Sequence, residues 1–207
     1  MSKNMNKSEH RPILIVIAGP NGSGKTSVTS RLLRHEWMED AIYVNPDIIA
    51  QEKFGDWNSQ DAVMKAAQYC EGLREQCLAE KKSLVFETVL SIDEKVNYIL
   101  RAHKAGFLIR FFFVCTANPT INAARIAQRV MEGGHDVPIP KIISRYNKSI
   151  IRGNVVSRFA DRTYVYDNSV NNAEARLLFR LSEGKLVKRY TDDIPEWAQI
   201  MLPGRPF

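Results

Sequence analysis

Short apolar runs bounded by turn residues alternate along this chain with segments of helical periodicity. The run Ile13–Ala18 is continuously apolar and leads into glycines, which is typical of a strand buried on both faces of a parallel sheet. Between residues 59 and 80, apolar residues recur at the spacing of one helix face. Four more apolar segments predict strands at residues 41–45, 83–87, 107–115 and 163–167.

Capping signals predict where several helices begin and end. Asn118 precedes a proline, so we expect a helix that starts there and runs to the glycine pair at residues 133–134. Ser91 and Glu94 have the spacing of a capping box, and Gly106 marks the end of that helix. Further expected elements are a helix after Gly24, a helix at 140–151, a hairpin of strands 177–181 and 186–190, and a short helix at 195–201.

Strands that alternate with helices in this way predict the α/β class, with a largely parallel five-stranded sheet, helices on both faces and a C-terminal hairpin extension. Ligands of such sheets bind at the carboxyl ends of the strands. We expect residues 1–11, which are polar, to form a disordered tail, and residues 12–207 to form a single domain.

The composition of the chain is that of a globular protein, with 44% hydrophobic and 25% charged residues among 207. No apolar stretch approaches the ~18 residues that a membrane span needs, so we expect no membrane partner. Three cysteines are an odd number, and Cys70 and Cys77 lie seven apart on one expected helix, about 10 Å along its axis and too far for a disulfide. A reducing cytoplasm suits such a chain.

The segment that starts at Gly19 matches the phosphate-binding pattern G-x-x-x-x-G-K-S/T, and it lies after a buried strand and before a helix, as that pattern requires. Small residues let backbone N–H groups wrap around phosphates at the positive end of the helix. The pattern predicts a P-loop fold and a site for ATP or GTP. Its expected nucleotide-binding residues are Gly19, Asn21, Gly22, Ser23, Gly24, Lys25, Thr26 and Ser27.

Two side chains of this loop have expected roles in phosphoryl transfer. Lys25 would reach the β and γ phosphates, and the hydroxyl of Thr26 would bind Mg²⁺.

Asp47 follows the second strand and is our candidate general base, which would accept the proton of an attacking hydroxyl. The alternative is that Asp47 only caps a helix starting at Ile48.

An acidic residue also ends the third strand. Glu87 follows several apolar residues, a pattern often found beside Mg²⁺, and it could touch the metal through water or hold a substrate hydroxyl. Thr88 would assist in binding substrate. The alternative is that Glu87 is simply solvated.

Arginines after residue 119 are candidates for binding phosphates from a closing lid. We expect Arg129 and Arg145 on the phosphates, because a guanidinium pairs two phosphate oxygens at once and keeps its charge. Arg125 and Arg152 are possible substitutes, and any of these side chains could instead lie on a solvated surface. His135, beside the glycine pair, is more typical of a loop hydrogen bond than of an acid or a ligand.

The net charge of +6 leaves a second class of function open. The expected C-terminal hairpin is basic, and a basic surface near a nucleotide would suit nucleic acid or phosphorylated ligands. Its cations are Arg176, Arg180, Lys185, Lys188 and Arg189.

Several motifs together resemble the zeta toxin family, over roughly residues 13–170 of the chain. Beside the phosphate loop, these motifs are Val-Asn-Pro-Asp ending at residue 47, Phe-Glu-Thr ending at 88, Gly-Gly-His-Asp-Val-Pro at 133–138 with Arg-Tyr at 145–146, and Val-Tyr-Asp-Asn at 165–168. The Gly-Gly-His-Asp-Val-Pro segment is similar to that of a short branch of the family.

This resemblance implies a P-loop kinase of a toxin–antitoxin system. The best-known members phosphorylate the 3′-hydroxyl of the sugar of UDP-N-acetylglucosamine, and an antitoxin protein inhibits them by covering the nucleotide site. By matching motif, the resemblance implies that Lys25 and Thr26 hold phosphate and Mg²⁺, that Asp47 is the base, and that Glu87 and Thr88 bind substrate; Arg129 and Arg145 look like the lid arginines. Other hypotheses are a kinase of another small metabolite or nucleotide, and an ATP-responsive module that binds nucleic acid or protein.

Overall fold

The computed structural model describes residues 11–32, 35, 41–55, 59–133 and 137–204. The tail expected over residues 1–11 lies outside these ranges except for Arg11. The guanidinium of Arg11 donates hydrogen bonds to a carboxylate oxygen of Asp161 at 3.0 Å and to the carbonyl of Phe107 at 2.9 Å. The start of the described chain is therefore fastened to the loops beside two strands.

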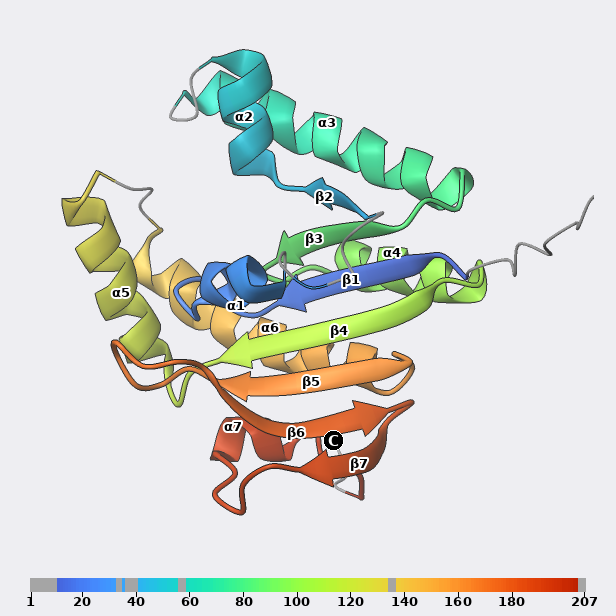
Figure 1. Ribbon diagram of the computed structural model, residues 1–207. Helices are drawn as coiled ribbons and strands as arrows, with labels where there is room; N and C mark the ends of the chain where they lie inside the picture. Colours follow the sequence, from blue (N-terminus) through green and yellow to red (C-terminus); the bar gives the residue numbers. More distant parts are fainter. Residues whose placement is uncertain (1–10, 33–34, 36–40, 56–58, 134–136, 205–207) are drawn as a thin grey trace, which may run out of the picture.

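A seven-stranded sheet forms the centre of the protein, in the order β2-β3-β1-β4-β5-β6-β7 (Figure 1). The first five of these are parallel, as predicted, and the C-terminal hairpin continues the sheet by pairing antiparallel with β5. The strands are β1 Ile13–Ala18, β2 Ile42–Val44, β3 Leu84–Thr88, β4 Leu108–Cys115, β5 Arg162–Asp167, β6 Arg176–Ser182 and β7 Lys185–Arg189.

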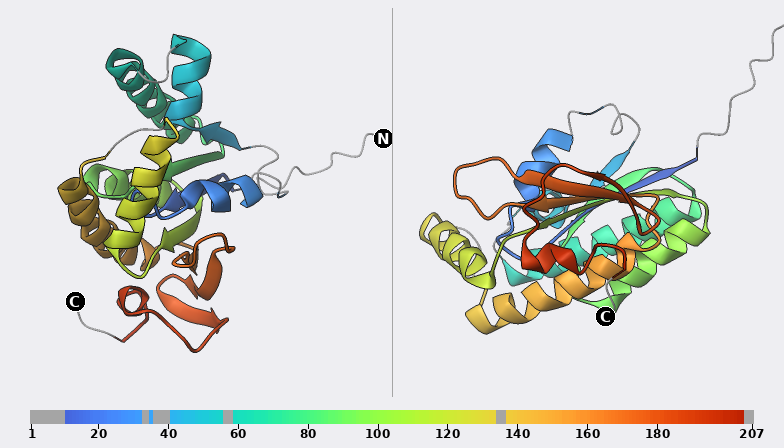
Figure 2. Two further views of the ribbon diagram at one scale, coloured as in Figure 1. Left: turned by 90° about the vertical axis from the view of Figure 1, so that its left-hand side faces the viewer. Right: turned by 90° about the horizontal axis from the view of Figure 1, so that it is seen from below.

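Helices connect the parallel strands and cover the sheet unequally. One face carries α3, α4, α6 and α7, whereas α1 lies on the other face (Figure 2). The helices are α1 Lys25–Leu32, α2 Pro46–Phe54, α3 Gln60–Ala79, α4 Asp93–Lys104, α5 Pro119–Met131, α6 Ile139–Ser157 and α7 Glu196–Gln199.

Alternate residues of β1 belong to two separate cores, which confirms that this strand is buried on both sides. Leu14 and Val16 pack into the large core under α3, α4 and α6, together with aromatic residues such as Phe111. Ile15 and Ile17 belong to a smaller core under α1. The period of two in side-chain direction explains why the sequence of this strand is continuously apolar.

The predicted helix starts are partly confirmed. Asn118 caps α5, since its side chain accepts bonds from the amides of Thr120 and Ile121. The capping box at Ser91 is wrong, because α4 begins at Asp93 and its cap residue makes no side-chain capping bond. The reason is a turn before the helix, where Leu90 has φ 55° and its amide donates to the Thr88 hydroxyl.

Helix α6 is longer than the expected 140–151, because Gly153, Asn154 and Val156 are buried and continue its packing to Ser157. The three cysteines are buried and form no disulfide. Among the residues that the structure describes, no helix is both long and apolar enough to cross a membrane.

Candidate active site

The candidate residues from β1, β2 and β3 meet at one edge of the sheet, where the arrowheads of the parallel strands in Figure 1 point toward α5. The phosphate loop follows β1 directly. Ala18 is in register with Thr88 of β3, and Val44 of β2 is in register with Phe86. The carboxyl ends of the strands therefore bring the loop, Glu87 and the start of α2 together.

The phosphate loop has a backbone that only glycine accommodates at two positions. Gly22 has φ 74°, and a Cβ on it would lie 2.6 Å from the carbonyl oxygen of Asn122. Gly24 has φ 87°, and a Cβ there would lie 2.1 Å from the side-chain nitrogen of Asn168. This left-handed backbone exposes amide groups at the start of α1, the arrangement that binds phosphate.

Three polar side chains, each from a different part of the chain, hold the phosphate loop in place. Asn122 of α5 donates to the carbonyl of Asn21 at 2.6 Å, and Asn168, just after β5, donates to the carbonyl of Ser23 at 2.9 Å. Arg145 of α6 donates to the side-chain oxygen of Asn21 at 3.3 Å. The loop is thus preorganised by contacts that span more than a hundred residues of sequence.

The side chain of Lys25 folds back over the loop. Its ammonium group donates to the carbonyl oxygens of Gly19 at 2.9 Å and Pro20 at 3.1 Å. Burial lowers the pKa of Lys25 to about 8; the nearby Arg129 lowers it as well, while Glu87 raises it. A phosphate would supply the negative charge that this lysine lacks.

A chain of hydrogen bonds links the ends of β2 and β3. The hydroxyl of Tyr43 donates to a carboxylate oxygen of Glu87 at 3.1 Å, and the side-chain amide of Asn45 donates to the Tyr43 oxygen at 2.9 Å. The other end of that amide accepts a bond from the backbone N–H of Asp47 at 2.9 Å. Burial, followed by the charge of Glu87, raises the pKa of Tyr43, so the phenol stays protonated and remains a donor. Glu87 is half-buried and bonded rather than simply solvated.

Asp47 is exposed in the first turn of α2, facing solvent at the edge that carries the loop. Asn45 takes the capping position of α2, so the alternative role of Asp47 as the cap is wrong. Its carboxylate is left available for other contacts. The hydroxyl of Thr88 accepts a bond from the Leu90 amide at 3.0 Å and retains its own hydrogen for a further acceptor.

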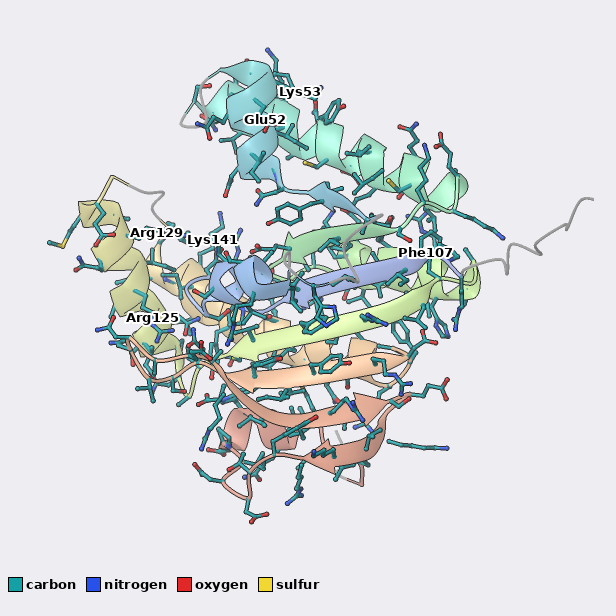
Figure 3. All side chains as sticks on the ribbon, viewed as in Figure 1. Glu52, Lys53, Phe107, Arg125, Arg129 and Lys141 are labelled. Carbon is teal, nitrogen blue, oxygen red and sulfur yellow. The ribbon has the colours of Figure 1, made fainter. Side chains whose placement is uncertain are left out.

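The four candidate arginines separate into different environments. Arg145 contacts the loop, and Arg129 on α5 is exposed at the same edge (Figure 3). Arg125 bonds the side-chain oxygen of Asn171 at 3.0 and 2.9 Å, and burial lowers its pKa. Arg152 pairs with Asp93 of α4 at 2.9 Å, and the structure does not bring it to the loop. The residues 134–136 of the expected lid, including His135, lie outside the described residues.

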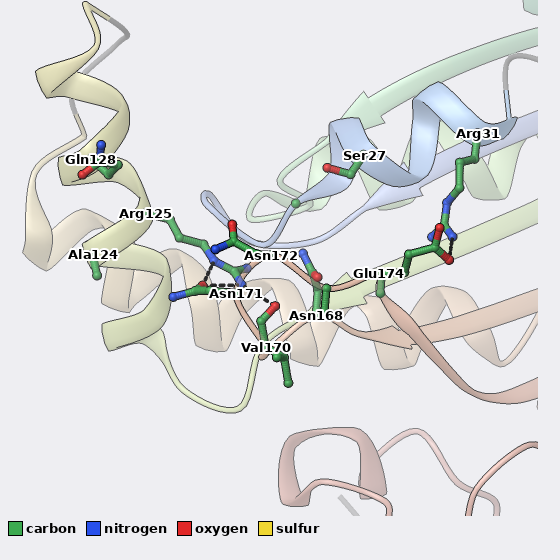
Figure 4. Close-up of a pocket in the computed structure, with 13 residues that line it drawn as sticks. Ser27, Arg31, Ala124, Arg125, Gln128, Asn168, Val170, Asn171, Asn172 and Glu174 are labelled. Atoms are coloured by element: carbon green, nitrogen blue, oxygen red, sulfur yellow. Dashed lines mark hydrogen bonds and ion pairs between the residues drawn. The ribbon is translucent and has the colours of Figure 1, made fainter.

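A cavity of about 820 Å³ opens beside the phosphate loop. It lies between α1, α5 and the segment after β5, and Figure 4 shows Arg125 reaching across it to Asn171. Amide groups line much of it, which suits the hydrogen-bonding edges of a base or a ribose. The polar side chains that line it are Ser27, Arg31, Arg125, Gln128, Asn168, Asn171, Asn172 and Glu174.

The residues that would hold a metal ion fit the expected chemistry. Thr26, the second residue of α1, is exposed next to the glycine cradle. Hydroxyl and carboxylate oxygens are the ligands that Mg²⁺ prefers, and Mg²⁺ keeps several waters when it binds nucleotide phosphates. Thr26 with a water-mediated contact to Glu87 is consistent with that pattern.

A sequence model of the zeta toxin family matches residues 1–174. The chain belongs to the zeta toxin family. An uncharacterized protein of Haemophilus influenzae is 28% identical over 134 residues, which are 64% of this chain and 91% of that relative. The family and the parallel sheet with its phosphate loop make the chain a P-loop kinase in fold.

Solved structures agree with this fold assignment. A chain of the AvrRxo1-ORF1:-ORF2 complex with ATP superposes with a TM-score of 0.64 at 19% identity, over 95% of this chain and 65% of that one. A chain from the PezAT toxin–antitoxin system of Streptococcus pneumoniae gives a TM-score of 0.55 at 17% identity, over 82% of this chain and 72% of that one. The chain thus spans about two thirds of the length of its AvrRxo1 relative.

Several side chains of the site were not predicted to act there. Asn45 precedes a proline, the same capping signal that predicts α5 at Asn118, so this role was readable from the sequence. Tyr43 and Asn122 have no such local signal, and Asn168 lies in the Val-Tyr-Asp-Asn motif without a role predicted for it. Their contacts form only when the sheet brings distant segments together.

Proposed function

We propose that this protein is a kinase that transfers the γ-phosphoryl group of ATP to a hydroxyl of a nucleotide-activated sugar, such as UDP-N-acetylglucosamine. The observation that carries this proposal is the meeting of the preorganised phosphate loop with the linked residues Tyr43, Glu87 and Asn45 at one sheet edge. Family membership supports the reaction class.

The phosphate loop and the amide-lined cavity would bind the two ends of ATP. Phosphates would rest on the backbone amides between Gly22 and Thr26, with Lys25 moving from its two carbonyl partners to the β and γ oxygens. Adenosine would occupy the cavity beside Arg125. Mg²⁺, held by Thr26 and through water by Glu87, would neutralise phosphate charge.

The acceptor would approach from the side of α2. Asp47 would take the proton of the attacking hydroxyl, and Glu87 and Thr88 would hold the sugar. Arg129 and Arg145 would stabilise the negative charge that develops on the transferred group. An antitoxin protein is a proposed partner, since the similar PezAT structure is that of a toxin–antitoxin system.

The decisive experiment measures transfer from γ-labelled ATP to a panel of UDP-sugars, nucleosides and RNA. Wild type is compared with Asp47→Asn and with Asp61→Asn. Asp61 is a matched control, because it is also the second residue of its helix, α3, and is also exposed. We expect label on a UDP-amino sugar with wild type and Asp61→Asn, and a loss of at least about a hundredfold with Asp47→Asn.

Two outcomes would count against the proposal. Label on a nucleoside or another small hydroxyl compound would show that the acceptor is that compound and not a UDP-sugar, while the kinase activity itself would stand. Tight ATP binding with no transfer to any acceptor would favour an ATP-responsive binding module instead.

A further inference from the structure

The face of the sheet opposite α3, α4 and α6 is open over β4 to β7. In Figure 1 this face points toward the viewer, and among the described helices only α1 lies over it, above β1. Side chains of β4 and β5 on this face lie on the same side as Phe112, which belongs to the small core under α1. We define the open face by Arg162, Tyr164, Tyr166, Arg180 and Lys188, of which the two tyrosines are partly buried against the small core.

Strand register aligns these side chains across the sheet. Phe112 is paired with Tyr164, Tyr164 with Arg180, and Arg180 with Lys188, which gives one row over four strands. In the first row the buried ring of Phe112 is followed by Tyr164 and then by two cations, Arg180 and Lys188, on neighbouring strands about 4.8 Å apart. In the next row Arg162, which is exposed, is paired with Arg110, whose Nε and Nη1 atoms are buried.

The charge of this surface is not balanced by carboxylates. In the four strands the sole carboxylate is Asp167, which is buried on the opposite face in the same alternation as Val165. Elsewhere arginines pair with acids, as Arg101 does with Glu75. Among the described residues, by contrast, Arg162, Arg180 and Lys188 take part in no ion pair.

Two details show that these cations are oriented rather than merely solvated. The Nε atom of Arg180 is buried and makes no hydrogen bond within the described part of the chain. The ammonium of Lys188 lies 4.8 Å from the centre of the Tyr190 ring, so Tyr190 extends the open face. An anion would complete the environment of these groups.

We propose that the open face binds single-stranded nucleic acid. Cations in rows attract a phosphate backbone, and tyrosines between them offer rings on which unpaired bases stack, a combination that an acidic protein or a lipid surface does not require. A flat sheet face does not enter a duplex groove, so a single strand is the preferred ligand. The face excludes Lys25, Asp47 and Glu87, and the inference does not depend on the proposed phosphoryl transfer.

The test measures the binding of a fluorescein-labelled single-stranded RNA of about 12 nucleotides, within the usual site size, by anisotropy without ATP. Arg162→Gln/Lys188→Gln removes two exposed cations of the open face. Lys104→Gln/Lys148→Gln is the matched control, since it removes two exposed cations from α4 and α6 on the other side and changes the net charge equally.

We expect the open-face double variant to bind about 25-fold more weakly at 0.1 M salt, because each lost phosphate contact lowers the slope of log K against log salt by about 0.7. The control should stay within about twofold. Equal losses in both variants would show only long-range charge attraction and would overturn the proposal. Equal affinity for a duplex of the same length would also overturn the proposal. Displacement of the RNA by polyglutamate or by phosphatidylserine vesicles would overturn it as well.

A second pair of variants tests stacking separately from charge. Tyr190 is 44% exposed and lies 4.8 Å from a lysine, and Tyr69 of α3 is 42% exposed and lies 4.8 Å from Lys53. Tyr190→Ser should weaken RNA binding about tenfold with an unchanged salt slope, whereas Tyr69→Ser should have no effect. Unchanged binding by Tyr190→Ser would overturn the stacking contribution and with it the choice of nucleic acid.

Discussion

The hydroxyl of Tyr43 donates a hydrogen bond to the carboxylate of Glu87 across two paired strands, β2 and β3. Tyr43 is in register with Val85, so the phenol reaches diagonally to a residue two positions further on. The contact fixes the carboxylate at the edge where the phosphate loop lies. Tyr43, which lies outside the sequence motifs, therefore orients Glu87, which lies inside one.

Tyr43→Phe should lower kcat about tenfold and leave the Kd for ATP unchanged, because it removes the donor that holds Glu87 and the acceptor of Asn45 without touching the phosphate loop. Steady-state kinetics with the identified acceptor, together with ATP titration, check both values. Tyr98→Phe is the control, since that hydroxyl bonds the carbonyl of Arg74, away from the site. If Tyr98→Phe lowers kcat equally, the effect belongs to stability and not to Glu87.

Nucleotide binding should weaken as pH rises above about 8, which is the pKa of Lys25 in the free protein. The protonated form of Lys25 binds phosphate. Above this pH the free protein has lost that proton, so it must take up a proton from solvent when the nucleotide binds. Isothermal titration calorimetry in buffers of different ionisation enthalpy measures that uptake. Glu87→Gln should shift the pH dependence to lower pH, because the Glu87 charge raises the pKa of Lys25.

A pH dependence of ATP affinity that stays flat from pH 7 to 9 would contradict this assignment. Lys104, exposed on α4, offers a control for general charge effects. Lys104→Gln should leave the midpoint of the pH dependence of ATP affinity unchanged from wild type.

Gly22→Ala should abolish nucleotide binding, because the new methyl group would lie 2.6 Å from a backbone carbonyl oxygen and force the phosphate loop to move. Gly106→Ala is the matched control. Gly106 also has a positive φ, 95°, but nothing lies within 4 Å of its Cβ position. Alanine at this position therefore adds backbone strain of about 1 kcal/mol without a collision. Thermal unfolding and ATP titration of the two variants separate strain from collision.

Asn168→Ala should raise the Kd for ATP several-fold, since the bond to the Ser23 carbonyl contributes about 1 kcal/mol to the ordering of the loop. The affinity is measured by titration with a fluorescent ATP analogue. Asn147→Ala, at an exposed position of α6, controls for removal of an amide. Equal affinities in the two variants would mean that the loop is ordered without Asn168.

The parallel sheet, the phosphate loop and most helices could be predicted from the sequence, because each depends on a local pattern such as the apolar run of β1 or the cap at Asn118. The start of α4 could not, since the turn at Leu90 depends on the Thr88 hydroxyl and replaces the capping box. Predicting the continuation of the sheet through the hairpin required knowing that β6 pairs with β5.

For the candidate site, the motifs contain Lys25, Glu87 and Asn168, but they do not show that Asn168 supports the phosphate loop. Lys25 and Glu87 follow from a local sequence pattern, and the structure places them near enough for Glu87 to affect the pKa of the lysine. Asn122 and Asn168 act through contacts between segments more than a hundred residues apart in sequence. The sequence left open whether Arg152 binds phosphate. In the structure this arginine forms an ion pair with Asp93 instead.

The three side chains that hold the phosphate loop come from residues 122, 145 and 168, whereas the loop itself is made within the first 26. During synthesis, the loop leaves the ribosome long before its supports. A nascent chain therefore cannot assemble the complete nucleotide site until β5 and the residue after it have been translated. Premature termination anywhere upstream of that point yields a fragment that lacks at least one of the three supports of the phosphate loop.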